Sequence, residues 1–191
     1  MSKNKTMTTS SSSSSFVITL VLCLIIASLM IPSKSNPLTK VCIKSKNPRF
    51  CLQVFGLNPH RSPYELTQEA INLALRNASE TASKIAIFLD DTKDDNLKVI
   101  YNYCLDYYHY AIDALRGAEE NFLKDGLVYD RVYVAGNFAQ KANFYCENEF
   151  QRIIGYVYAS TLTKDNERMG IFGSIIVAAA DILSNSTLVE K

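Results

Sequence analysis

The sequence has no tryptophan and contains only 7 glycines, 5 prolines and 2 histidines in 191 residues. Turn-rich β folds consume glycine and proline, so their scarcity favours long helices and an all-α fold. The 20 lysines and arginines nearly balance the 19 acidic residues, and the formal net charge is +1. Because no run of Lys and Arg forms the basic footprint that a phosphate backbone attracts, nucleic acid is not an expected partner. The length suits one domain with a sizeable core.

A mainly apolar run of 16 residues, Phe16–Ile31, follows a serine-rich start. A helix that crosses a bilayer needs about 20 apolar residues, whereas the apolar core of a signal peptide has about 7 to 15. Small residues stand at the −3 and −1 positions of a cleavage before Asn36. The sequence therefore predicts a secretory signal peptide over 1–35, a domain over 36–191 and no membrane association after cleavage. An uncleaved signal anchor is the alternative.

Four cysteines follow the apolar run: Cys42, Cys51, Cys104 and Cys146. An even number in an exported chain indicates two disulfides, for which three connectivities are possible. The turn signal at 46–48 favours a short helical hairpin closed by Cys42 and Cys51, which leaves Cys104 to pair with Cys146. Free buried thiols are the alternative. A metal site is not expected, because the sequence has no CxxC motif and too few histidines.

Two tripeptides match the acceptor pattern for N-glycosylation, Asn77-Ala78-Ser79 and Asn185-Ser186-Thr187. Such tripeptides recur by chance, and they indicate exposed surface only where a glycan is found. Asn77 and Asn185 are therefore candidate glycosylation sites.

The segment 37–60 contains the hairpin, and the first long helix begins directly after it. Ser62 and Pro63 supply an N-cap and a first-turn proline, and Glu65 completes a capping box. The helix ends in the charged cluster 90–95, which we interpret as a solvated turn, because it lacks the glycine and the distal glutamate of a calcium-binding loop.

Apolar residues that recur at three- and four-residue steps predict three more helices. The second carries one face of Leu97, Ile100, Cys104, Tyr108, Ala111 and Leu115. The third carries Val132, Ala135, Ala139, Ala142, Cys146, Phe150 and Ile153. The fourth, about 168–184, is apolar on almost every side. The pattern predicts an antiparallel four-helix bundle with an N-terminal helical hairpin and two disulfides.

Motifs of known catalytic sites are missing from the sequence, among them GxSxG, HExxH and GxGxxG. Neither His60 nor His109 lies in a local arrangement of nucleophile and carboxylate that would make it a general base. We therefore expect no enzyme activity, no catalytic residue and no cofactor. A binding function remains.

Five tyrosines lie between Tyr101 and Tyr110, and three of them, Tyr103, Tyr107 and Tyr110, flank the core stripe of the second helix. Half-exposed tyrosines on a rigid helix suit a protein interface, since they bring area at low entropic cost. If they form an interface, replacing Tyr107 and Tyr110 by Ala should leave stability nearly unchanged. The alternative is that the rings lie against the adjacent helix with only their hydroxyls in water. Tyr129, Tyr133 and Tyr145 are placed to extend the patch.

The four cysteines and the string Cys104-x-x-x-Tyr108-x-x-Ala111-Ile112-x-x-Leu115 resemble the plant invertase and pectin methylesterase inhibitor family. The resemblance covers about 37–185. It implies a secreted, non-catalytic inhibitor that blocks pectin methylesterase in the plant cell wall, as a monomer in a 1:1 complex. Family inhibitors of pectin methylesterase cover the pectin-binding cleft of the enzyme with the second and third bundle helices, here about 97–150. The candidate partner-binding residues are Tyr103, Tyr107, Tyr110, Tyr133 and Phe138.

Some positions depart from the family pattern. Residues 137–140 stand where many members have S-A-A-L, and Tyr145 stands where threonine is usual. The segment 120–122 keeps only the aromatic residue of the Pro-Lys-Phe motif of invertase inhibitors, whereas Glu147 after the fourth cysteine is common in them. Inhibition of an acid invertase, in the cell wall or the vacuole, is therefore the alternative function. A non-inhibitory, secreted helical binding protein is the alternative of another class.

Overall fold

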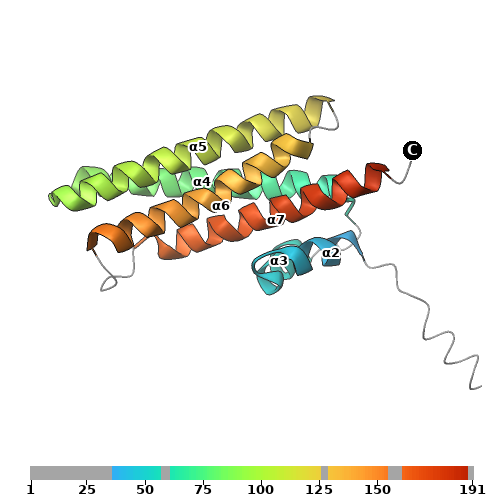
Figure 1. Cartoon of the computed structure of the whole chain (residues 1–191), viewed down its shortest axis with the longest axis horizontal. Coiled ribbons are helices and arrows are strands. Elements are labelled where there is room, and N and C mark those ends of the chain that lie inside the picture. Colours follow the sequence, from blue (N-terminus) through green and yellow to red (C-terminus); the bar gives the residue numbers. More distant parts are fainter. Residues whose placement is uncertain (1–35, 57–60, 126–128, 155–160, 189–191) are drawn as a thin grey trace, which may run out of the picture. The chain divides into compact units, whose positions relative to one another are not determined.

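The computed structural model describes residues 36–56, 61–125, 129–154 and 161–188, with side chains described except at 121–125, 154 and 185–188 (Figure 1). The predicted signal peptide, 1–35, lies outside the described residues. The described ranges hold six α-helices and no strand: α2 Pro37–Lys44, α3 Pro48–Phe55, α4 Pro63–Asp91, α5 Asp95–Asp125, α6 Tyr129–Ile154 and α7 Thr163–Leu188.

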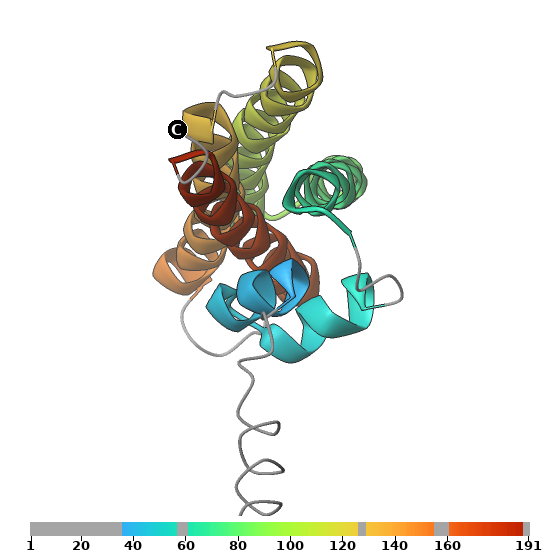
Figure 2. The ribbon, with the colours of Figure 1, turned by 90° about the vertical axis from the view of Figure 1, so that its right-hand side faces the viewer.

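The four long helices lie side by side, and each runs antiparallel to the one before it in the chain (Figure 1). Helix α4 packs on α5 and α7, α5 packs on α6, and α6 packs on α7. The short helices α2 and α3 pack on each other, and α2 packs on α7. Figure 2 shows this hairpin on the side of the bundle away from α5. The predicted all-α bundle with an N-terminal hairpin is confirmed.

The start of α4 has the geometry expected of a capping box. The backbone N–H of Glu65 donates to the Ser62 hydroxyl at 3.2 Å, and the backbone N–H of Ser62 donates to Oε2 of Glu65 at 2.8 Å. The bond from the Ser62 backbone is the main cause that lowers the pKa of Glu65. In the charged cluster after α4, Asp94 Oδ1 accepts from the backbone N–H of Asn96 at 2.8 Å and so caps the start of α5.

Both disulfides of the favoured pairing are present. Cys42 and Cys51 close the hairpin with Cα atoms 5.3 Å apart, and Cys104 and Cys146 join α5 to α6 with Cα atoms 4.7 Å apart. All four cysteines are buried. The two helices that carry the tyrosines are therefore covalently linked.

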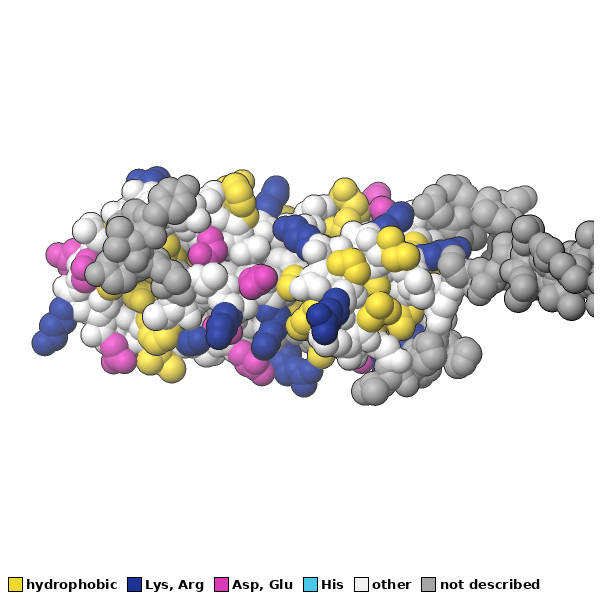
Figure 3. Space-filling view, turned by 90° about the horizontal axis from the view of Figure 1, so that it is seen from below, with side chains coloured by type: hydrophobic (Ala, Val, Ile, Leu, Met, Phe, Trp, Pro, Cys, Tyr) yellow, Lys and Arg dark blue, Asp and Glu magenta, His cyan; other side chains and the backbone are white. Residues whose placement is uncertain are grey.

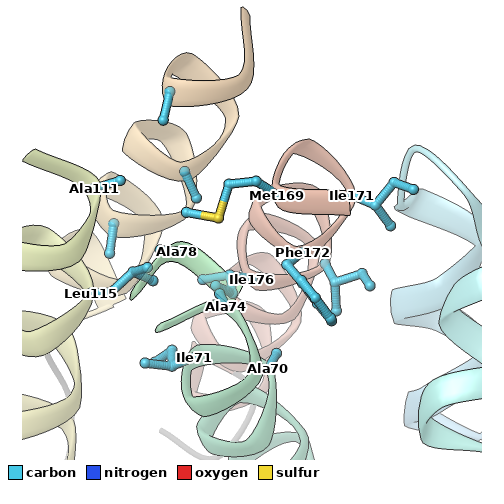
Figure 4. Close-up of a cluster of buried hydrophobic side chains, with 14 of the residues drawn as sticks. Ala70, Ile71, Ala74, Ala78, Ala111, Leu115, Met169, Ile171, Phe172 and Ile176 are labelled. Carbon is cyan, nitrogen blue, oxygen red and sulfur yellow. The ribbon is translucent and has the colours of Figure 1, made fainter. Parts of the chain in front are cut away.

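In the part of the core that Figure 4 shows, three alanines of α4 pack among larger side chains, including Ile71 of α4 itself. Ala70, Ala74 and Ala78 of α4 and Leu115 of α5 are fully or nearly fully buried, as is Ile176 of α7. Helix α7 is buried on nearly every side because α4, α6 and α2 all pack on it. It is also longer than the predicted 168–184 at both ends.

Two glycines bring α6 and α7 into backbone contact. A Cβ atom added at Gly136 would lie 2.9 Å from the carbonyl oxygen of Gly173, and one added at Gly173 would lie 2.6 Å from that of Gly136. Such distances are shorter than any side chain tolerates, so the close packing of these helices depends on both glycines.

A buried polar network crosses the bundle beside the second disulfide. The hydroxyl of Tyr108 donates to Oδ1 of Asn166 at 2.6 Å, and Nδ2 of Asn166 donates to Oε1 of Glu147 at 2.6 Å. The Thr163 hydroxyl donates to the other oxygen of Glu147 at 3.3 Å. Burial raises the pKa of Tyr108, so its hydroxyl remains a donor. The network links α5, α6 and α7 and gives Glu147 a structural role.

Candidate functional site

Four of the five candidate partner-binding residues lie along the junction of α5 and α6. Tyr107 of α5 stacks on Tyr145 of α6, with ring centroids 4.7 Å apart and 19° between the ring planes. Tyr103 and Tyr110 lie one turn to either side of Tyr107 on α5, and both are exposed, by 45% and 61%. We call Tyr103, Tyr107, Tyr110, Phe138 and Tyr145 the aromatic seam.

Phe138 joins the seam through its register on α6. It lies between Val134, which lines a hollow shared with α5, and Tyr145, which stacks on Tyr107 of α5. The Phe138 ring is 38% exposed, and the ammonium group of Lys141 lies 5.7 Å from its centroid. This cation–π contact holds a positive charge at the edge of the seam.

Tyr133, which the sequence placed to extend the same patch, lies away from the seam. It precedes Phe138 by five residues, which at ~100° per residue places it about 140° away around α6. Gln140, two turns after Tyr133, lies against Gly173 of α7. Tyr133 is therefore exposed by 45% on the α7 side of α6. The sequence pattern could not show this, because it does not fix how α6 is rotated against α5.

The tyrosines of α5 differ in how deeply they are buried. Tyr107 is half-buried and packs against the core, as expected for a ring lying on the adjacent helix. Partial burial and the neighbouring Tyr145 and Glu149 raise the pKa of Tyr107, so its hydroxyl remains protonated. Tyr103 and Tyr110 are more exposed than Tyr107, and both leave part of the ring available to a partner.

A hollow of about 300 Å³ lies between α5 and α6, farther along α5 than Tyr110. Its lining comes from both helices: Ala114, Gly117, Ala118, Asp130, Arg131 and Val134. A Cβ atom added at Gly117 would meet nothing within 4 Å. We call this feature the seam hollow. The small residues of α5 leave a space in which an apolar side chain of a partner fits, with Asp130 and Arg131 beside it.

The structure contradicts the surface exposure that a glycan at Asn77 would need. The Asn77 side chain is only 7% exposed, and its amide lies against Met169 of α7. Asn77 falls on the inner side of α4, where packing of α7 covers it. The side chain of Asn185 lies outside the described residues.

No group of three or more His, Cys, Asp and Glu side chains gathers in the described ranges in a way that would hold a metal ion. Among the helices of these ranges, none combines the length and apolar character that a membrane crossing requires.

Comparison with known proteins identifies a family. Residues 36–178 match the family model for plant invertase/pectin methylesterase inhibitors. The chain is 30% identical over 124 residues to a pectinesterase inhibitor from Actinidia deliciosa, an alignment that covers 63% of this chain and 66% of the relative. It is 29% identical over 96 residues to pectinesterase inhibitor 1 from Arabidopsis thaliana, covering 49% of this chain and 54% of the relative. The chain thus spans just under two thirds of the length of the first relative and about half of the length of the second.

Solved structures share the fold. A mutant form of a pectin methylesterase inhibitor from Arabidopsis superposes with a TM-score of 0.67 at 19% identity, covering 77% of this chain and 97% of that one. A further crystal structure of a pectin methylesterase inhibitor from Arabidopsis thaliana gives a TM-score of 0.59 at 20% identity, covering 78% of this chain and 97% of that one. Together with the match of the family model over most of the chain, these findings show that the chain belongs to the plant invertase/pectin methylesterase inhibitor family.

Proposed function

We propose that this chain is a secreted, non-catalytic inhibitor of pectin methylesterase and that it binds the enzyme through the aromatic seam. Two relatives at about 30% identity carry the name pectinesterase inhibitor, which supports this enzyme as the target. Acid invertase is the second candidate, because the description of the family names it as well.

The observation that carries the proposal is the rigid mounting of exposed aromatic rings. Cys104 directly follows Tyr103 and Cys146 directly follows Tyr145, so the disulfide between α5 and α6 lies at the seam itself. A tyrosine side chain has few torsions to immobilise, and a covalently linked pair of helices pays little further entropy on binding. The seam is thereby prepared for a tight complex.

The seam hollow gives the complex a place for an anchor residue. Interfaces gain most of their free energy where one side chain fills a desolvated pocket near their centre. Ala114, Gly117 and Ala118 supply an apolar floor of this kind, and the exposed Tyr110 precedes Ala114 by about one turn of α5. An apolar side chain of the enzyme is its expected occupant.

Residues 1–35 would direct the chain out of the cell and be removed before Asn36. The cell wall is then the site of action, with the vacuole as the alternative. We expect the mature inhibitor to be a monomer that forms a 1:1 complex.

The test is a titration of enzyme activity at mildly acidic pH. The purified, oxidised protein is added in increasing amounts to pectin methylesterase and, in parallel, to acid invertase. The proposal predicts that methylesterase activity falls to a plateau near one equivalent while invertase activity is retained. Methylesterase activity that is unchanged at a large excess would refute it. Loss of invertase activity alone would establish the second candidate.

A further inference from the structure

A second groove lies on the side of the bundle away from the seam, where α3, α4 and α7 meet. It consists of two adjoining hollows of about 290 and 200 Å³ that share Asn77, Glu80 and Arg168. The larger is at the lower end of the size range in which small-molecule sites fall. We call the two together the hairpin groove.

A buried amide forms part of the lining of both hollows. Asn77 is 7% exposed, and the acceptor recorded for its Nδ2 group among the described residues is the thioether sulfur of Met169, at 3.8 Å. A thioether is a weak acceptor, so this amide is left with donor capacity that a strong acceptor would use. The groove lined by Asn77 is therefore suited to a ligand that carries hydroxyl or carboxylate oxygens.

One wall of the larger hollow is apolar and aromatic. Phe50 of α3 packs edge-on against Phe172 of α7 with centroids 5.7 Å apart, and Val54 and Leu73 complete the wall. An apolar, aromatic wall of this kind suits a ring that has an apolar face.

The charged residues of the groove favour an anion. Lys84 and Asp165 form an ion pair at 2.7 Å and so neutralise each other. Arg76 and Arg168 are exposed, and neither forms an ion pair within the described part of the chain. Glu80 is the remaining acid. Two guanidinium groups against one carboxylate leave a net positive charge, and guanidinium groups match carboxylates in geometry.

The hairpin extends this basic surface. Lys40, Lys44, Lys46 and Arg49 are all exposed, and residues 36–56 contain no acidic residue. Asp181 of α7 pairs with Lys44 at 3.5 Å. Figure 3 shows the lower face of the molecule, on which hydrophobic and basic side chains gather over the half that carries the hairpin.

We propose that the hairpin groove and the basic hairpin bind an acidic polysaccharide made of uronic acid units. The carboxylates would pair with Arg76 and Arg168, a hydroxyl would accept from the Asn77 amide, and the apolar face of a sugar ring would lie against Phe50 and Phe172. The choice of polymer rests on the proposed function. Hydrolysis of each methyl ester in pectin consumes water and releases methanol, which leaves one carboxylate on the polymer for this surface to bind.

The position of the groove permits two partners at once. The groove lies on α3, α4 and α7, whereas the seam lies on α5 and α6. Figure 2 shows the hairpin and α5 on opposite sides of the bundle. The inhibitor would thus stay on de-esterified pectin while its seam remains free for the enzyme.

The protein is made in a bacterial host without N-glycosylation. The test measures how it binds to immobilised polygalacturonate in the absence of pectin methylesterase. Fully methyl-esterified pectin and the sulfated polymer dextran sulfate serve as comparison ligands. The variant Arg76→Gln/Arg168→Gln removes the two charges of the groove. Its matched control is Lys93→Gln/Arg116→Gln, which removes two exposed charges elsewhere.

Polygalacturonate should bind in low salt and be released as salt screens the contacts. The groove variant should bind polygalacturonate about tenfold more weakly than the parent, whereas the control variant should bind it as tightly as the parent does. No binding, equal binding of the methyl-esterified polymer, tighter binding of dextran sulfate, or equal losses in both variants would overturn the proposal. Complex formation with pectin methylesterase, followed by gel filtration without pectin, tests the inhibitor function separately and should be the same for all three proteins.

Discussion

The rings of Tyr107 and Tyr145 stack across the α5–α6 junction, with centroids 4.7 Å apart. This contact changes what the removal of Tyr107 should do. A ring that was only part of an interface would leave stability nearly unchanged when lost, whereas a stacked, half-buried ring also holds two helices together. Within the seam, this stacked pair therefore supports the fold, whereas Tyr103 and Tyr110 are more exposed.

We predict that Tyr107→Ala and Tyr145→Ala each lower the free energy of unfolding. Their effects should be non-additive, with a coupling of about 0.5–1.5 kcal/mol from the stacked pair. Urea unfolding of the parent, both single variants and the double variant measures this coupling. Strictly additive losses would show that the two rings do not interact in solution.

Removal of the inter-helix disulfide should have a large effect. The variant Cys104→Ser/Cys146→Ser is expected to lose about 2–5 kcal/mol of unfolding free energy, since the bond closes the longer loop and links the seam helices. The comparison variant is Cys42→Ser/Cys51→Ser, which opens a loop with a sequence separation of 9 rather than 42 and should lose less. Equal urea midpoints for the parent and the first variant, under oxidising conditions, would contradict this account.

A glycine substitution tests the close packing of α6 and α7. In Gly173→Ala the new Cβ atom would meet the carbonyl oxygen of Gly136 at 2.6 Å and the backbone nitrogen of Gln140 at 2.8 Å. We expect a loss of about 1–3 kcal/mol from overpacking. Gly117→Ala is the control, because its Cβ atom has open space and alanine favours a helix by up to about 1 kcal/mol. Thermal unfolding that shifts in the same direction for both variants would argue against the backbone contact.

Tyr108→Phe removes one hydroxyl from the buried network. Oδ1 of Asn166 then loses the donor that lies 2.6 Å away, which should cost about 1–3 kcal/mol at neutral pH. The same substitution at the exposed Tyr110, Tyr110→Phe, should change stability little. Chemical unfolding of both variants at neutral pH gives the comparison, and equal midpoints for them would exclude a stabilising bond at Tyr108.

The network also predicts a dependence on alkaline pH. Because burial raises the pKa of Tyr108 above its ordinary value of 10.0, the folded protein keeps a proton that the unfolded chain loses. The contribution of Tyr108 to stability is therefore complete below about pH 10 and is lost as the pH rises further. Unfolding measured from pH 8 upward should decline less steeply in Tyr108→Phe than in the parent. Identical slopes would show that Tyr108 is not protected from ionisation.

Local patterns predicted most of the fold because they arise from local physics. The capping box at Ser62 is formed by residues three apart, and the core stripe around Cys104 follows from helical periodicity. The turn between the first two cysteines likewise favoured the hairpin and its disulfide. These features depend on residues that are close together in the sequence.

Features that depend on how one helix lies against another could not be predicted. Asn77 matches a glycosylation pattern, yet the packing of α7 on α4 covers it. Tyr108 and Asn166 are 58 residues apart, and no sequence rule links them. Tyr133 on α6 is as exposed as Tyr103 on α5, but it lies on the side of α6 that faces away from the seam. The rotation of α6 about its own axis decides this, and the sequence does not fix that rotation.

The pair Tyr103 and Tyr133 gives the most direct test of the central claim, because both side chains are 45% exposed and only one belongs to the aromatic seam. The measurement is the dissociation constant of the complex with pectin methylesterase for the parent, Tyr103→Ala and Tyr133→Ala. We predict that Tyr103→Ala weakens binding about tenfold or more, as loss of an interface tyrosine does, while Tyr133→Ala binds like the parent. If the Tyr133 variant is the weaker binder, or both bind like the parent, the enzyme does not bind at the seam.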